Sequence, residues 1–552
     1  MEKMEKKWNV FGISRNLDEI KEVLLRQRGF PSLEEAQEFL KLDHPLNYIR
    51  KFPTDFKKSL KDAKKLIQEN IQAENPILIH GDYDADGVCA SSILYNYFSK
   101  ELGYEKTFYF IPNRFDHGYG LSRESIEEAL EMVKAKTGDN GKILFITVDS
   151  GITSKDEVAY LKEKDHDVII TDHHQKPKEL PLADVIVWSD QIVGAAIAWL
   201  LARVLGSKES DNLALATLAT ITDVYPLKGI NRAIVKRGLE SINKSPPLGL
   251  KELIKTSGIK DKELDTYHLG WVLGPRINAT GRISNASKSV ELFTTLDSRV
   301  AQAAASYLSD INRKRQDETN KMYNYISDLS PENRFILVHN SDFHEGIIGL
   351  VASRLVRKFY RPSIVISTND KVGKGSVRSI EGINIIEILR EFEDLFVDLG
   401  GHPMAAGFTI PIDQIENLEN SLANVFSSRF KNDIFIPSVD VDVEMPLSLV
   451  DWDLFNFIQE LKPFGEGNRP PLFLSRSLKA VNINFVGRDK SHTSLKLSDG
   501  TRFQKAIYFN SRDQFENISL GDRVDVVYSI KENNYRGNRS LDLFVKDIRL
   551  SS

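Results

Sequence analysis

Four short clusters of aspartate and histidine are the part of this sequence that could perform chemistry. The first is HGDYDADG at residues 80–87, and the second is DSG at residues 149–151. The third is DHH at residues 172–174, and the fourth is Asp223 alone. Carboxylates and imidazoles bind divalent cations, and acids gathered in one place repel each other unless cations neutralise them. If the clusters meet in the fold, they predict a metal centre, and their number favours two ions.

The elements that position these clusters can be predicted from apolar runs. Each of the first three clusters closes a run typical of a buried strand, at residues 76–79, 142–148 and 167–171. In an open parallel sheet the carboxyl ends of the strands border one crevice. An apolar helix over residues 211–221 would deliver Asp223. We therefore expect a parallel α/β sheet that gathers all four clusters.

The residue types suggest a division of roles at this site. Two divalent ions about 3.5–4 Å apart can activate water and stabilise both oxygens of a phosphoryl displacement. Asp149 could bridge them, because a carboxylate has two oxygens. His173 is the better ligand of its pair, and His174 is left to orient phosphate or donate a proton, because adjacent side chains at a strand end point in different directions. Oxygen ligands suit Mg²⁺ or Mn²⁺, and imidazole favours Mn²⁺.

The acidic clusters have two other possible interpretations. Asp82, Asp84, Asp86 and Gly87 match the first six positions of an EF-hand loop, but position twelve is Ile93 where a glutamate is required. The preceding segment is also a predicted strand rather than a helix, so we exclude this mode of calcium binding. Any single cluster could instead be a helix cap or a solvated turn. Four clusters at the ends of elements favour the metal centre.

Composition bounds the class of protein. A chain of 552 residues with 41% hydrophobic and 27% charged residues is typical of a globular protein with three or four domains. A single cysteine, Cys89, excludes an internal disulfide and a cysteine zinc site. There is no signal peptide at the start and no stretch that could span a membrane, so we expect a cytoplasmic protein. The net charge of −5 does not indicate a nucleic-acid binder, although a balanced total can hide a basic groove.

The pattern of apolar and polar residues along the sequence predicts an α/β multidomain protein with five segments. Residues 1–50 form an N-terminal helical extension, and residues 51–297 form the catalytic α/β domain. Residues 298–329 have the apolar periodicity of a long linking helix. Residues 330–433 form a smaller α/β domain. Residues 434–552 alternate in short segments separated by turns, which is typical of an all-β barrel.

The clusters and several other motifs resemble the DHH phosphoesterase superfamily, which is named after the third cluster. Within it the sequence is similar to the RecJ family, bacterial 5′→3′ exonucleases specific for single-stranded DNA. Besides the clusters, the resemblance lies in residues 111–114, 118–120, 274–282, 344–349, 400–402 and 463–468. It covers nearly the whole chain, including a DHH-associated substrate domain and an OB-type barrel. Thr280 departs from the family pattern, which has a smaller residue there.

The resemblance implies roles for the metal centre. The residues expected to bind metal directly are Asp84, Asp86, Asp149, His173 and Asp223. His80 and Asp82 belong to the same motif and would bind metal directly or through water; we assign His80 to the metals and Asp82 to catalysis. His174 would contact the scissile phosphate. His402 would face the metals from the second α/β domain, although a histidine after two glycines could equally be structural.

The substrate contacts are predicted partly by chemistry and partly by the resemblance. We assign Arg114, Ser376 and Arg378 to the terminal 5′ phosphate, because phosphate is bound by guanidinium forks and hydroxyl groups. Gly373 and Gly375 would let backbone amides approach it. Without the resemblance, Arg378 would be interpreted as a surface arginine in a turn.

Further contacts remain open between two interpretations. Tyr119 could stack on a base or only cover a hydrophobic edge. Arg276, Asn278 and Arg282 could bind phosphate or nucleotide, or form a network that ties loops together. Residues 313–315 of the linking helix could follow the DNA backbone, although charged helix faces are usually just solvated. In the barrel, basic and aromatic residues alternate in a way that suits single-strand binding: Lys479, Arg488, Lys490, Lys496, Arg502 and Lys505 with Phe485, Phe503 and Tyr508.

These expectations combine into one predicted function, a 5′→3′ exonuclease that degrades single-stranded DNA to mononucleotides with two Mn²⁺ or Mg²⁺ ions in recombination and repair. One alternative is a phosphoesterase acting on oligoribonucleotides, cyclic dinucleotides or polyphosphate, which would not need the barrel. Another is an inactive nucleic-acid-binding scaffold, which would have no reason to keep so many acids together. The resemblance also implies a monomer that cooperates with single-stranded DNA-binding protein and a RecQ-type helicase.

Overall fold

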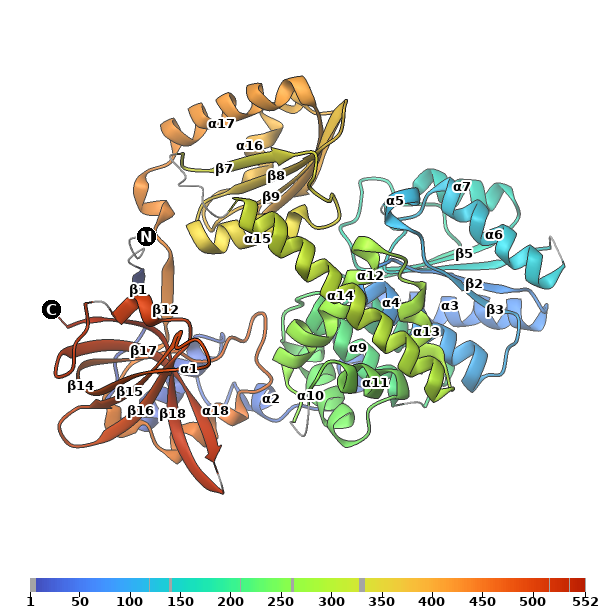
Figure 1. Ribbon diagram of the computed structural model, residues 1–552. Coiled ribbons are helices and arrows are strands. Elements are labelled where there is room, and N and C mark those ends of the chain that lie inside the picture. The colour runs from blue at the N-terminus through green and yellow to red at the C-terminus, as the bar shows by residue number, and fades with distance from the viewer. Residues whose placement is uncertain are drawn as a thin grey trace.

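The chain forms three bodies, and one long helix runs from the first to the second, as Figure 1 shows. The computed structural model describes residues 6–551 apart from 119, 139–140, 209, 260–262, 327–332, 516 and 536. Among these described residues, no helix combines the length and apolarity needed to cross a membrane.

The first body is built on a parallel sheet whose strands end where the acidic clusters begin. Its order is β3-β2-β4-β5-β6, and all neighbouring strands are parallel. Its strands are β2 (Ile77–His80), β3 (Thr107–Phe110), β4 (Leu144–Val148), β5 (Asp167–Asp172) and β6 (Val185–Trp188). The strands β2, β4 and β5 are buried along their whole length, because helices cover both faces, which explains their unbroken apolar runs. The three predicted strands are confirmed.

Helices pack on both faces of this sheet. One core contains side chains of α3 (Thr54–Gln72), α4 (Ala85–Tyr95) and α8 (Gly194–Leu205). The core on the other face contains side chains of α6 (Arg123–Thr137) and α7 (Lys155–Glu163). Both helices that follow an acidic cluster, α4 and α7, therefore begin at the carboxyl edge of the sheet.

A helical layer extends the first core and leads to the long helix. It consists of α9 (Asp211–Thr222), α10 (Gly229–Lys244), α11 (Leu248–Thr256), η3 (His268–Leu273), α12 (Gly274–Ile283) and α13 (Ser287–Thr294). The helix α9 ends directly before Asp223, as expected. The linking helix is α14 (Ser298–Ile326), which packs on α11, α12 and α13. The end of the helix predicted up to residue 329 lies outside the described residues.

The second body is a smaller α/β domain with a mixed sheet of order β10-β11-β9-β8-β7. Its elements are β7 (Ile336–Asn340), α15 (Ile348–Phe359), β8 (Ser363–Thr368), β9 (Val372–Arg378), α16 (Ile385–Arg390), β10 (Asp398–His402), β11 (Ala405–Pro411) and α17 (Ile415–Arg429). It contacts the first body directly, since a Cβ at Gly346 would lie 2.1 Å from the carbonyl oxygen of Arg282. The ring of His344 also lies 5.8 Å from that of Phe115, in α5 (Arg114–His117).

The third body is the predicted barrel, closed by the pairing of β14 with β17. Its strands are β14 (Phe473–Val486), β15 (His492–Ser498), β16 (Phe503–Tyr508), β17 (Arg523–Tyr535) and β18 (Asn538–Leu550), and α18 (Trp452–Glu460) packs into its core. The barrel includes more of the chain than the sequence suggested, because the N-terminal segment joins it.

The predicted helical extension over residues 1–50 contains the helices α1 (Leu17–Arg26), α2 (Gln37–Leu40) and η1 (Pro45–Lys51), but it also contains a strand that was not predicted. The segment begins with β1 (Lys7–Val10), which pairs in parallel with β12 (Ser438–Val441). The apolar side chains of α1 then lie in the barrel core. Four residues of β1 are too few to show a periodicity, and their pairing partner lies more than 400 residues away, so the sequence offers no local signal of this strand.

Two buried arginines stabilise this junction: Arg232 joins the first body to the barrel domain, and Arg28 ties the N-terminal segment to it. Arg232 of α10 is fully buried, and its guanidinium donates hydrogen bonds to the backbone oxygens of four residues: Phe39, Glu460, Leu461 and Pro463. Arg28 donates to the Asn468 side chain at 2.8 Å and to the carbonyl oxygen of Leu24 at 2.7 Å. The N–H of Leu227 donates to the Glu466 carbonyl at 2.7 Å. The motif at residues 463–468 is thus the contact between the barrel domain and the segment that follows Asp223.

Candidate metal centre

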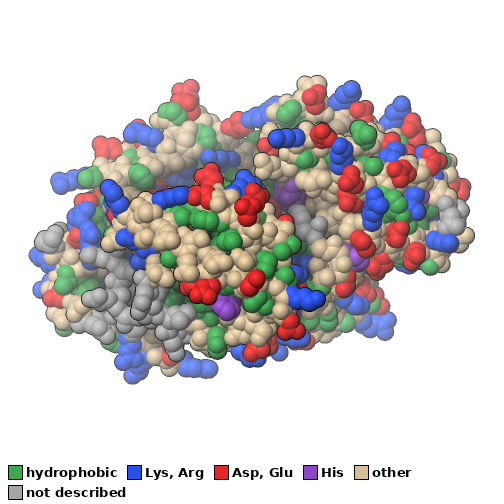
Figure 2. All heavy atoms as spheres, turned by 90° about the horizontal axis from the view of Figure 1, so that it is seen from above, with side chains coloured by type: hydrophobic (Ala, Val, Ile, Leu, Met, Phe, Trp, Pro, Cys, Tyr) green, Lys and Arg blue, Asp and Glu red, His purple; other side chains and the backbone are tan. Residues whose placement is uncertain are grey.

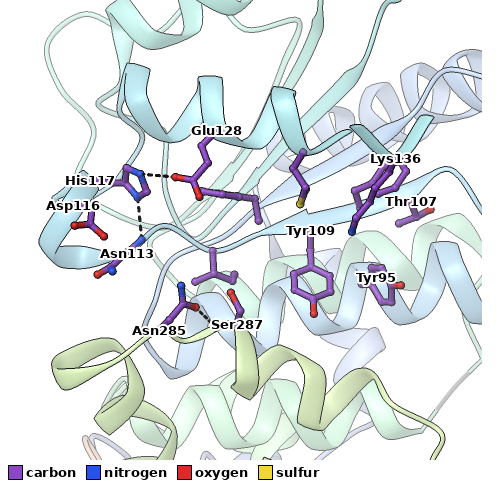
Figure 3. A pocket seen from close by; sticks show the side chains of 14 residues that line it. Tyr95, Thr107, Tyr109, Asn113, Asp116, His117, Glu128, Lys136, Asn285 and Ser287 are labelled. Carbon is purple, nitrogen blue, oxygen red and sulfur yellow. Dashed lines mark hydrogen bonds and ion pairs between the residues drawn. The ribbon is translucent and has the colours of Figure 1, made fainter. Parts of the chain in front are cut away.

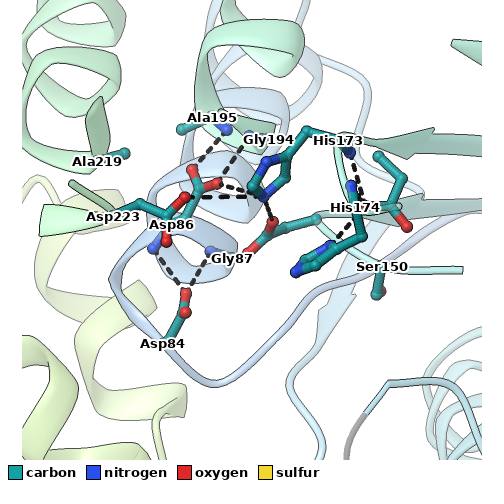
Figure 4. A network of polar contacts seen from close by, with 12 residues as sticks. Asp84, Asp86, Gly87, Ser150, His173, His174, Gly194, Ala195, Ala219 and Asp223 are labelled. Carbon is teal, nitrogen blue, oxygen red and sulfur yellow. Dashed lines mark hydrogen bonds and ion pairs between the residues drawn. The ribbon is translucent and has the colours of Figure 1, made fainter. Parts of the chain in front are cut away.

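The acidic and histidine clusters meet at the carboxyl edge of the first sheet, as the sequence predicts (Figure 4). Three overlapping groups each place their ligand atoms within 4.8 Å of one another. They are Asp149 with His173 and His174, Asp86 with His173 and Asp223, and Asp82 with Asp84 and Asp149. Because Asp149 and His173 each belong to two groups, the groups form one continuous site, which is the arrangement that two neighbouring ions need.

Asp86 is held by the start of α8. Its Oδ2 accepts a hydrogen bond from the N–H of Gly194 at 2.7 Å, and its Oδ1 accepts one from Ala195 at 2.7 Å. A helix N-terminus stabilises negative charge, so α8 offsets part of the effect of burial on the pKa of this carboxylate. A Cβ at Gly194 would lie 2.8 Å from the Cβ of Asp149, so glycine allows α8 to come this close. Sequence reasoning missed Gly194 and Ala195, and a glycine at the start of an apolar helix was the available signal.

The loop before α4 is fixed by its own side chains. The Oδ1 of Asp84 accepts hydrogen bonds from the N–H groups of Asp86 at 2.8 Å and Gly87 at 3.1 Å, which caps α4. The Oδ1 of Asn278 accepts one from the N–H of Ala85 at 2.7 Å. Asn278 was predicted to contact the substrate, but this oxygen is occupied by the loop, so the geometry favours the open alternative in which it ties loops together.

His173 presents a lone pair to the acids. Its Nδ1 lies 2.8 Å from the hydroxyl of Tyr225, which itself donates to the Asp190 carbonyl at 3.2 Å. The Tyr225 oxygen therefore accepts the proton on Nδ1, and Nε2 is unprotonated. Burial, together with the positive charge of His174, lowers the pKa of His173 to about 4, so the ring is neutral at pH 7. Tyr225 was missed in the sequence, where its only signal is its place two residues after Asp223.

The acceptor atoms at the site fit divalent cations. Nε2 of His173 lies 2.9 Å from Oδ1 of Asp149, so a nitrogen lone pair and a carboxylate oxygen face each other. Two ligands at right angles on an ion with bonds near 2.1 Å are about 3 Å apart. Oδ1 of Asp82 is buried without a hydrogen-bond partner among the described residues. A cation would satisfy all three atoms, and the mixture of carboxylates and imidazole suits Mn²⁺ or Mg²⁺.

When no cation is present, the acids repel one another, and this raises their pKa values. Burial and the charge of Asp84 raise the pKa of Asp82 to about 8 and that of Asp86 to about 7. Burial and the charge of Asp86 raise the pKa of Asp223 to about 8 and that of Asp149 well above its usual value. Carboxylates whose pKa values rise in this way hold their charge only with nearby positive charge. The electrostatics therefore agree with the geometry.

The backbone is strained at two places in this site. Asp149 has a φ of 60° and Val224, directly after Asp223, has a φ of 58°. Side-chain-bearing residues rarely adopt this left-handed region, least of all a β-branched valine. The N–H of Asp149 donates to the Thr171 carbonyl at 2.9 Å, which holds the turn. Strain at one predicted metal ligand and directly after another is consistent with a functional site.

His174 is oriented by Asp172, the first residue of the third cluster. Oδ1 of Asp172 lies 2.8 Å from Nδ1 of His174 and also accepts from both backbone N–H groups of the histidine pair. Burial opposes protonation of His174, but the hydrogen bond and charge of Asp172 outweigh it and raise the pKa of His174 to about 9. His174 is thus charged at pH 7 and half exposed, which suits contact with a phosphate. The site predictions overlooked Asp172, although the motif itself contains it.

His80 lies apart from the other clusters. Its Nε2 is 3.1 Å from the Ser125 hydroxyl, and its ring packs between Phe110 and Phe145. Burial and the charge of His117 lower the pKa of His80 to about 3. It belongs to none of the three ligand groups found among the described residues. The prediction of His80 as a metal ligand is therefore corrected: side chains alternate along β2, and His80 points to the α6 face of the sheet.

A cavity of about 520 Å³ beside β3 lies outside the metal centre (Figure 3). It is lined by Tyr109, Lys136 and Asn285 among others, and none of the predicted site residues lines it. His117 and Glu128 form an ion pair at 3.0 Å on its wall. Cavity size therefore does not locate the chemistry in this protein.

Arg114, Arg282, Ser376 and Arg378 come together where the two α/β bodies meet. The charges of Arg114 and Arg378, after burial, lower the pKa of Arg282. The Arg378 guanidinium donates to the Ser376 hydroxyl at 3.2 Å. Both lie against the start of α15, since a Cβ at Gly349 would be 2.9 Å from the Ser376 oxygen and 3.0 Å from an Arg378 nitrogen. Three arginines, a hydroxyl and a helix N-terminus form a place for a phosphate.

Two predicted residues are not brought to this site by the described contacts. Tyr119 lies outside the described residues. His402 is exposed at the end of β10, and within the described part of the chain no hydrogen bond or ion pair involves it. Its role opposite the metals stays a prediction.

The barrel presents part of the expected basic and aromatic surface. Phe503 and Phe485 are 59% and 40% exposed, and the Lys496 ammonium lies 4.6 Å from the centre of the Phe503 ring. Tyr508 is buried instead, and its hydroxyl donates to the Lys546 carbonyl at 3.1 Å. Tyr508 is therefore a core residue, as strand alternation requires of some of these aromatics.

Three models of known families match separate parts of the chain. Residues 76–222 match the DHH family N-terminal domain, residues 332–428 the DHHA1 domain, and residues 441–547 the RecJ OB domain.

The relatives are similar over most of their length. The single-stranded-DNA-specific exonuclease RecJ of Bacillus subtilis is 34% identical over 544 residues, covering 96% of this chain and 67% of the relative. The protein of the same description from Haemophilus influenzae is 30% identical, covering 88% of this chain and 90% of the relative. The crystal structure of Thermus thermophilus RecJ in complex with Mn²⁺ superposes with a TM-score of 0.81 at 28% identity, covering 99% of this chain and 80% of that one. The chain belongs to the RecJ family.

Proposed function

We propose that this protein is a metal-dependent exonuclease that degrades single-stranded DNA from its 5′ end and releases mononucleotides. The observation that carries the proposal is the position of a charged phosphate pocket, formed by Arg114, Arg282, Ser376 and Arg378, next to a cluster of acids that requires cations. The pocket and the acids are linked through Asp84, whose negative charge acts on Arg282. RecJ relatives are described as single-stranded-DNA-specific exonucleases, and a RecJ structure holds Mn²⁺.

Within this proposal the ligands of two Mn²⁺ or Mg²⁺ ions are Asp82, Asp84, Asp86, Asp149, His173 and Asp223. When bound, such ions supply a nucleophilic water and stabilise the charge on the phosphate. Asp149 and His173 serve both parts of the site, while the N–H groups of Gly194 and Ala195 orient the carboxylate of Asp86.

His174 has a separate role in the chemistry. Because Asp172 holds its Nδ1 and keeps the ring charged, the imidazolium of His174 can donate toward a phosphate oxygen. A charged donor stabilises the negative charge that develops on phosphate oxygens in the transition state. In this role His174 stabilises charge by a hydrogen bond and does not transfer its proton.

Polarity of cleavage follows from the pocket. A terminal 5′ phosphate carries more negative charge than an internal one, and three arginines with Ser376 can surround it. Holding that end beside the metals places the next phosphodiester at the site of hydrolysis. We propose that mononucleotide release reflects this fixed spacing.

Strand specificity follows from where the site lies. Figure 2 shows the surface hollowed between the two α/β bodies, with Lys and Arg side chains near the rim. Helix α15 and the Arg282 backbone approach each other there through Gly346. We propose that a single strand reaches the metals and that a duplex is too wide to do so.

The test uses 5′-phosphorylated single strands, blunt duplexes and 3′-tailed duplexes, incubated with a series of divalent metals. We expect Mn²⁺ or Mg²⁺ to support release of mononucleotides from the 5′ end of single strands, and Asp149→Ala to abolish it. Equal cleavage of duplex and single strand would contradict the specificity. Cleavage of dinucleotides alone would favour a small-substrate phosphoesterase.

The finer properties of the protein form part of the same proposal. We propose the domain division stated from the sequence, a monomer, a cytoplasmic location and a role in recombination and repair. We also propose cooperation with single-stranded DNA-binding protein and a RecQ-type helicase. Co-sedimentation of the purified proteins on gapped DNA, with and without the barrel residues 434–552, tests these partners.

A further inference from the structure

The loop that carries Arg114 of the terminal-phosphate pocket has little to hold it in place by itself. Its helix α5 has four residues, and a helix of that length is not stable without support from the rest of the fold. Among the described residues, the Arg114 side chain makes no hydrogen bond and no ion pair, and its guanidinium lies 5.7 Å from the centre of the Tyr83 ring. The position of this guanidinium therefore depends on where the backbone of α5 is held.

A cavity borders this loop where packed side chains would otherwise support it. The cavity of about 520 Å³ is lined by Asn113 and His117 of the loop and by Glu128 of α6, as Figure 3 shows. None of the four residues of α5 is buried. Phe115 is 41% exposed, and its ring meets the edge of the His344 ring with 5.8 Å between their centres. Apolar packing therefore contributes little to holding α5, and hydrogen bonds have to do most of it.

His117 closes the loop and ties it to α6. Its Nδ1 accepts a hydrogen bond from the N–H of Asn113 at 3.0 Å, while its own N–H donates to the Asn113 carbonyl at 2.8 Å. Because Nδ1 accepts, Nε2 carries a proton, and Nε2 lies 3.0 Å from the Oε2 of Glu128. One side chain, only 9% exposed, thus connects both ends of α5 to a 15-residue helix that packs in the core of the first body.

We infer that His117 is a positioning residue, which holds α5 through Glu128 so that Arg114 faces the terminal phosphate. This inference rests on the proposed function of Arg114. The contacts of His117 are with Asn113, Glu128 and the ring of Phe110, none of which is a predicted metal ligand. A loop that is in the productive position for part of the time lowers the apparent affinity by that fraction. His117 therefore acts on recognition of the 5′ end and not on the hydrolysis step.

The experiment removes the contacts of His117 separately and together. His117→Phe keeps an aromatic ring and loses both nitrogens, whereas His117→Asn keeps an acceptor near the position of Nδ1. Glu128→Ala removes the acceptor on α6. Two matched controls are Glu131→Ala, on an exposed acid of the same helix, and His44→Asn, on a histidine whose ring also accepts a hydrogen bond at a helix N-terminus.

Each protein is assayed with Mn²⁺ on 10-mer oligothymidylates that carry either a 5′ phosphate or a 5′ hydroxyl. The initial release of the first nucleotide is measured, and the ratio of the two kcat/KM values gives the preference for the phosphate. Arg114→Ala, alone and combined with His117→Phe, completes a mutant cycle.

A second measurement needs no substrate. Trypsin cleaves after Arg114, and mass spectrometry of the fragment that begins at Phe115 follows the rate. This rate reports how often α5 opens in the metal-free protein.

We expect Glu128→Ala and His117→Asn to lower the preference for the 5′ phosphate about 2- to 5-fold, the effect of one hydrogen bond, and His117→Phe about 5- to 30-fold. The loss is expected in KM, while kcat and the rate on the 5′ hydroxyl stay within about twofold. Trypsin should cleave after Arg114 faster in all three variants. Arg114→Ala should lower the preference about 10- to 100-fold, as a charged hydrogen bond does, and adding His117→Phe to it should change nothing further. Both controls are expected to behave as the parent protein.

The outcomes separate this inference from the proposed function. If Arg114→Ala lowers the preference and the His117 and Glu128 variants do not, the inference is overturned and the proposed function stands. Equal losses of kcat on both substrates would also overturn the inference, because the loop would then act on the metal centre. An unchanged preference in Arg114→Ala would contradict the terminal-phosphate pocket. In that case faster cleavage by trypsin would still support the anchoring of α5 by His117, and an unchanged cleavage rate would overturn it as well.

Discussion

The metal centre and the junction around Arg232 both bury charge. At the junction the buried charge is hydrogen-bonded by the protein, whereas at the metal centre part of it is not. Arg232 gives its protons to four backbone oxygens, and Arg28 nearby is satisfied in the same way. At the metal centre, Asp82 keeps a buried oxygen with no partner, and Asp149 faces an unprotonated nitrogen. A buried charge that the protein satisfies completely is a structural contact. One that it leaves unsatisfied is a binding site.

The same criterion separates arginines of the same chain. Arg232 is fully buried with its donors used, whereas Arg276 and Arg315 each retain a buried donor with no partner among the described residues. Arg276 and Arg315 are also only half-buried, so we expect them to respond to substitution differently from Arg232.

The largest expected effect is that of Asp149→Asn on activity. Removing the charge shared by two ligand groups should lower kcat with Mn²⁺ by roughly a thousandfold, since a bound metal contributes several kcal/mol to the transition state. The metal-free variant should be at least as stable as the parent protein, because a repulsive charge is gone. Initial rates and urea unfolding in EDTA measure both. A variant that loses stability in EDTA would break the comparison.

Arg232→Ala is expected to do the reverse. Four backbone oxygens would lose their donor in a buried place, which should lower the free energy of unfolding by about 3–5 kcal/mol. The loss should be the same with and without Mn²⁺, because Arg232 contacts no metal ligand. Urea unfolding under both conditions is the measurement. Arg237→Gln is the exposed control, and a destabilisation seen only without metal would show that the junction is part of the metal site.

A smaller effect is expected for Tyr225→Phe. Without the hydroxyl, Nδ1 of His173 loses the partner that fixes its tautomer, and the affinity for Mn²⁺ should fall about 10- to 100-fold. Isothermal titration calorimetry measures the affinity, and excess Mn²⁺ should recover kcat. Tyr267→Phe, on an exposed tyrosine away from the acids, is the control. Failure of excess metal to restore activity would assign Tyr225 a different role.

The smallest effect concerns pH. The pKa values of Asp82 and Asp223 are near 8 in the fold and near 4 in the unfolded chain, so the folded protein holds more protons between these values. The stability that these two acids contribute to the metal-free protein is therefore fully present below about pH 4 and is lost as the pH rises toward 8. Saturating Mn²⁺ should flatten this dependence above pH 6 by neutralising the acids. Thermal unfolding from pH 5 to 9, with EDTA or Mn²⁺, tests the sign.

Much of the site could be predicted because its signals are local. Apolar strands that end in Asp and His clusters predicted that these side chains lie at one edge of the sheet, since parallel strands share that edge. The structure brings together Asp84, Asp86, Asp149 and His173 from the strand ends and Asp223 from the end of α9. His80 failed because a single residue at a strand end can point to either face, and only the pairing of β2 decides which.

The sequence by itself determined the chemistry, the parallel sheet, the long helix and the existence of a barrel, because each depends on residue type and short-range periodicity. Tertiary structure alone decided which partners complete each group. Tyr225 reaches His173, Gly194 admits α8 to Asp86, and β1 joins β12 across the whole chain. Such contacts unite residues that are distant in sequence, and no local pattern encodes their distance. Only the tertiary structure decides whether a buried charge finds hydrogen-bond partners in the protein.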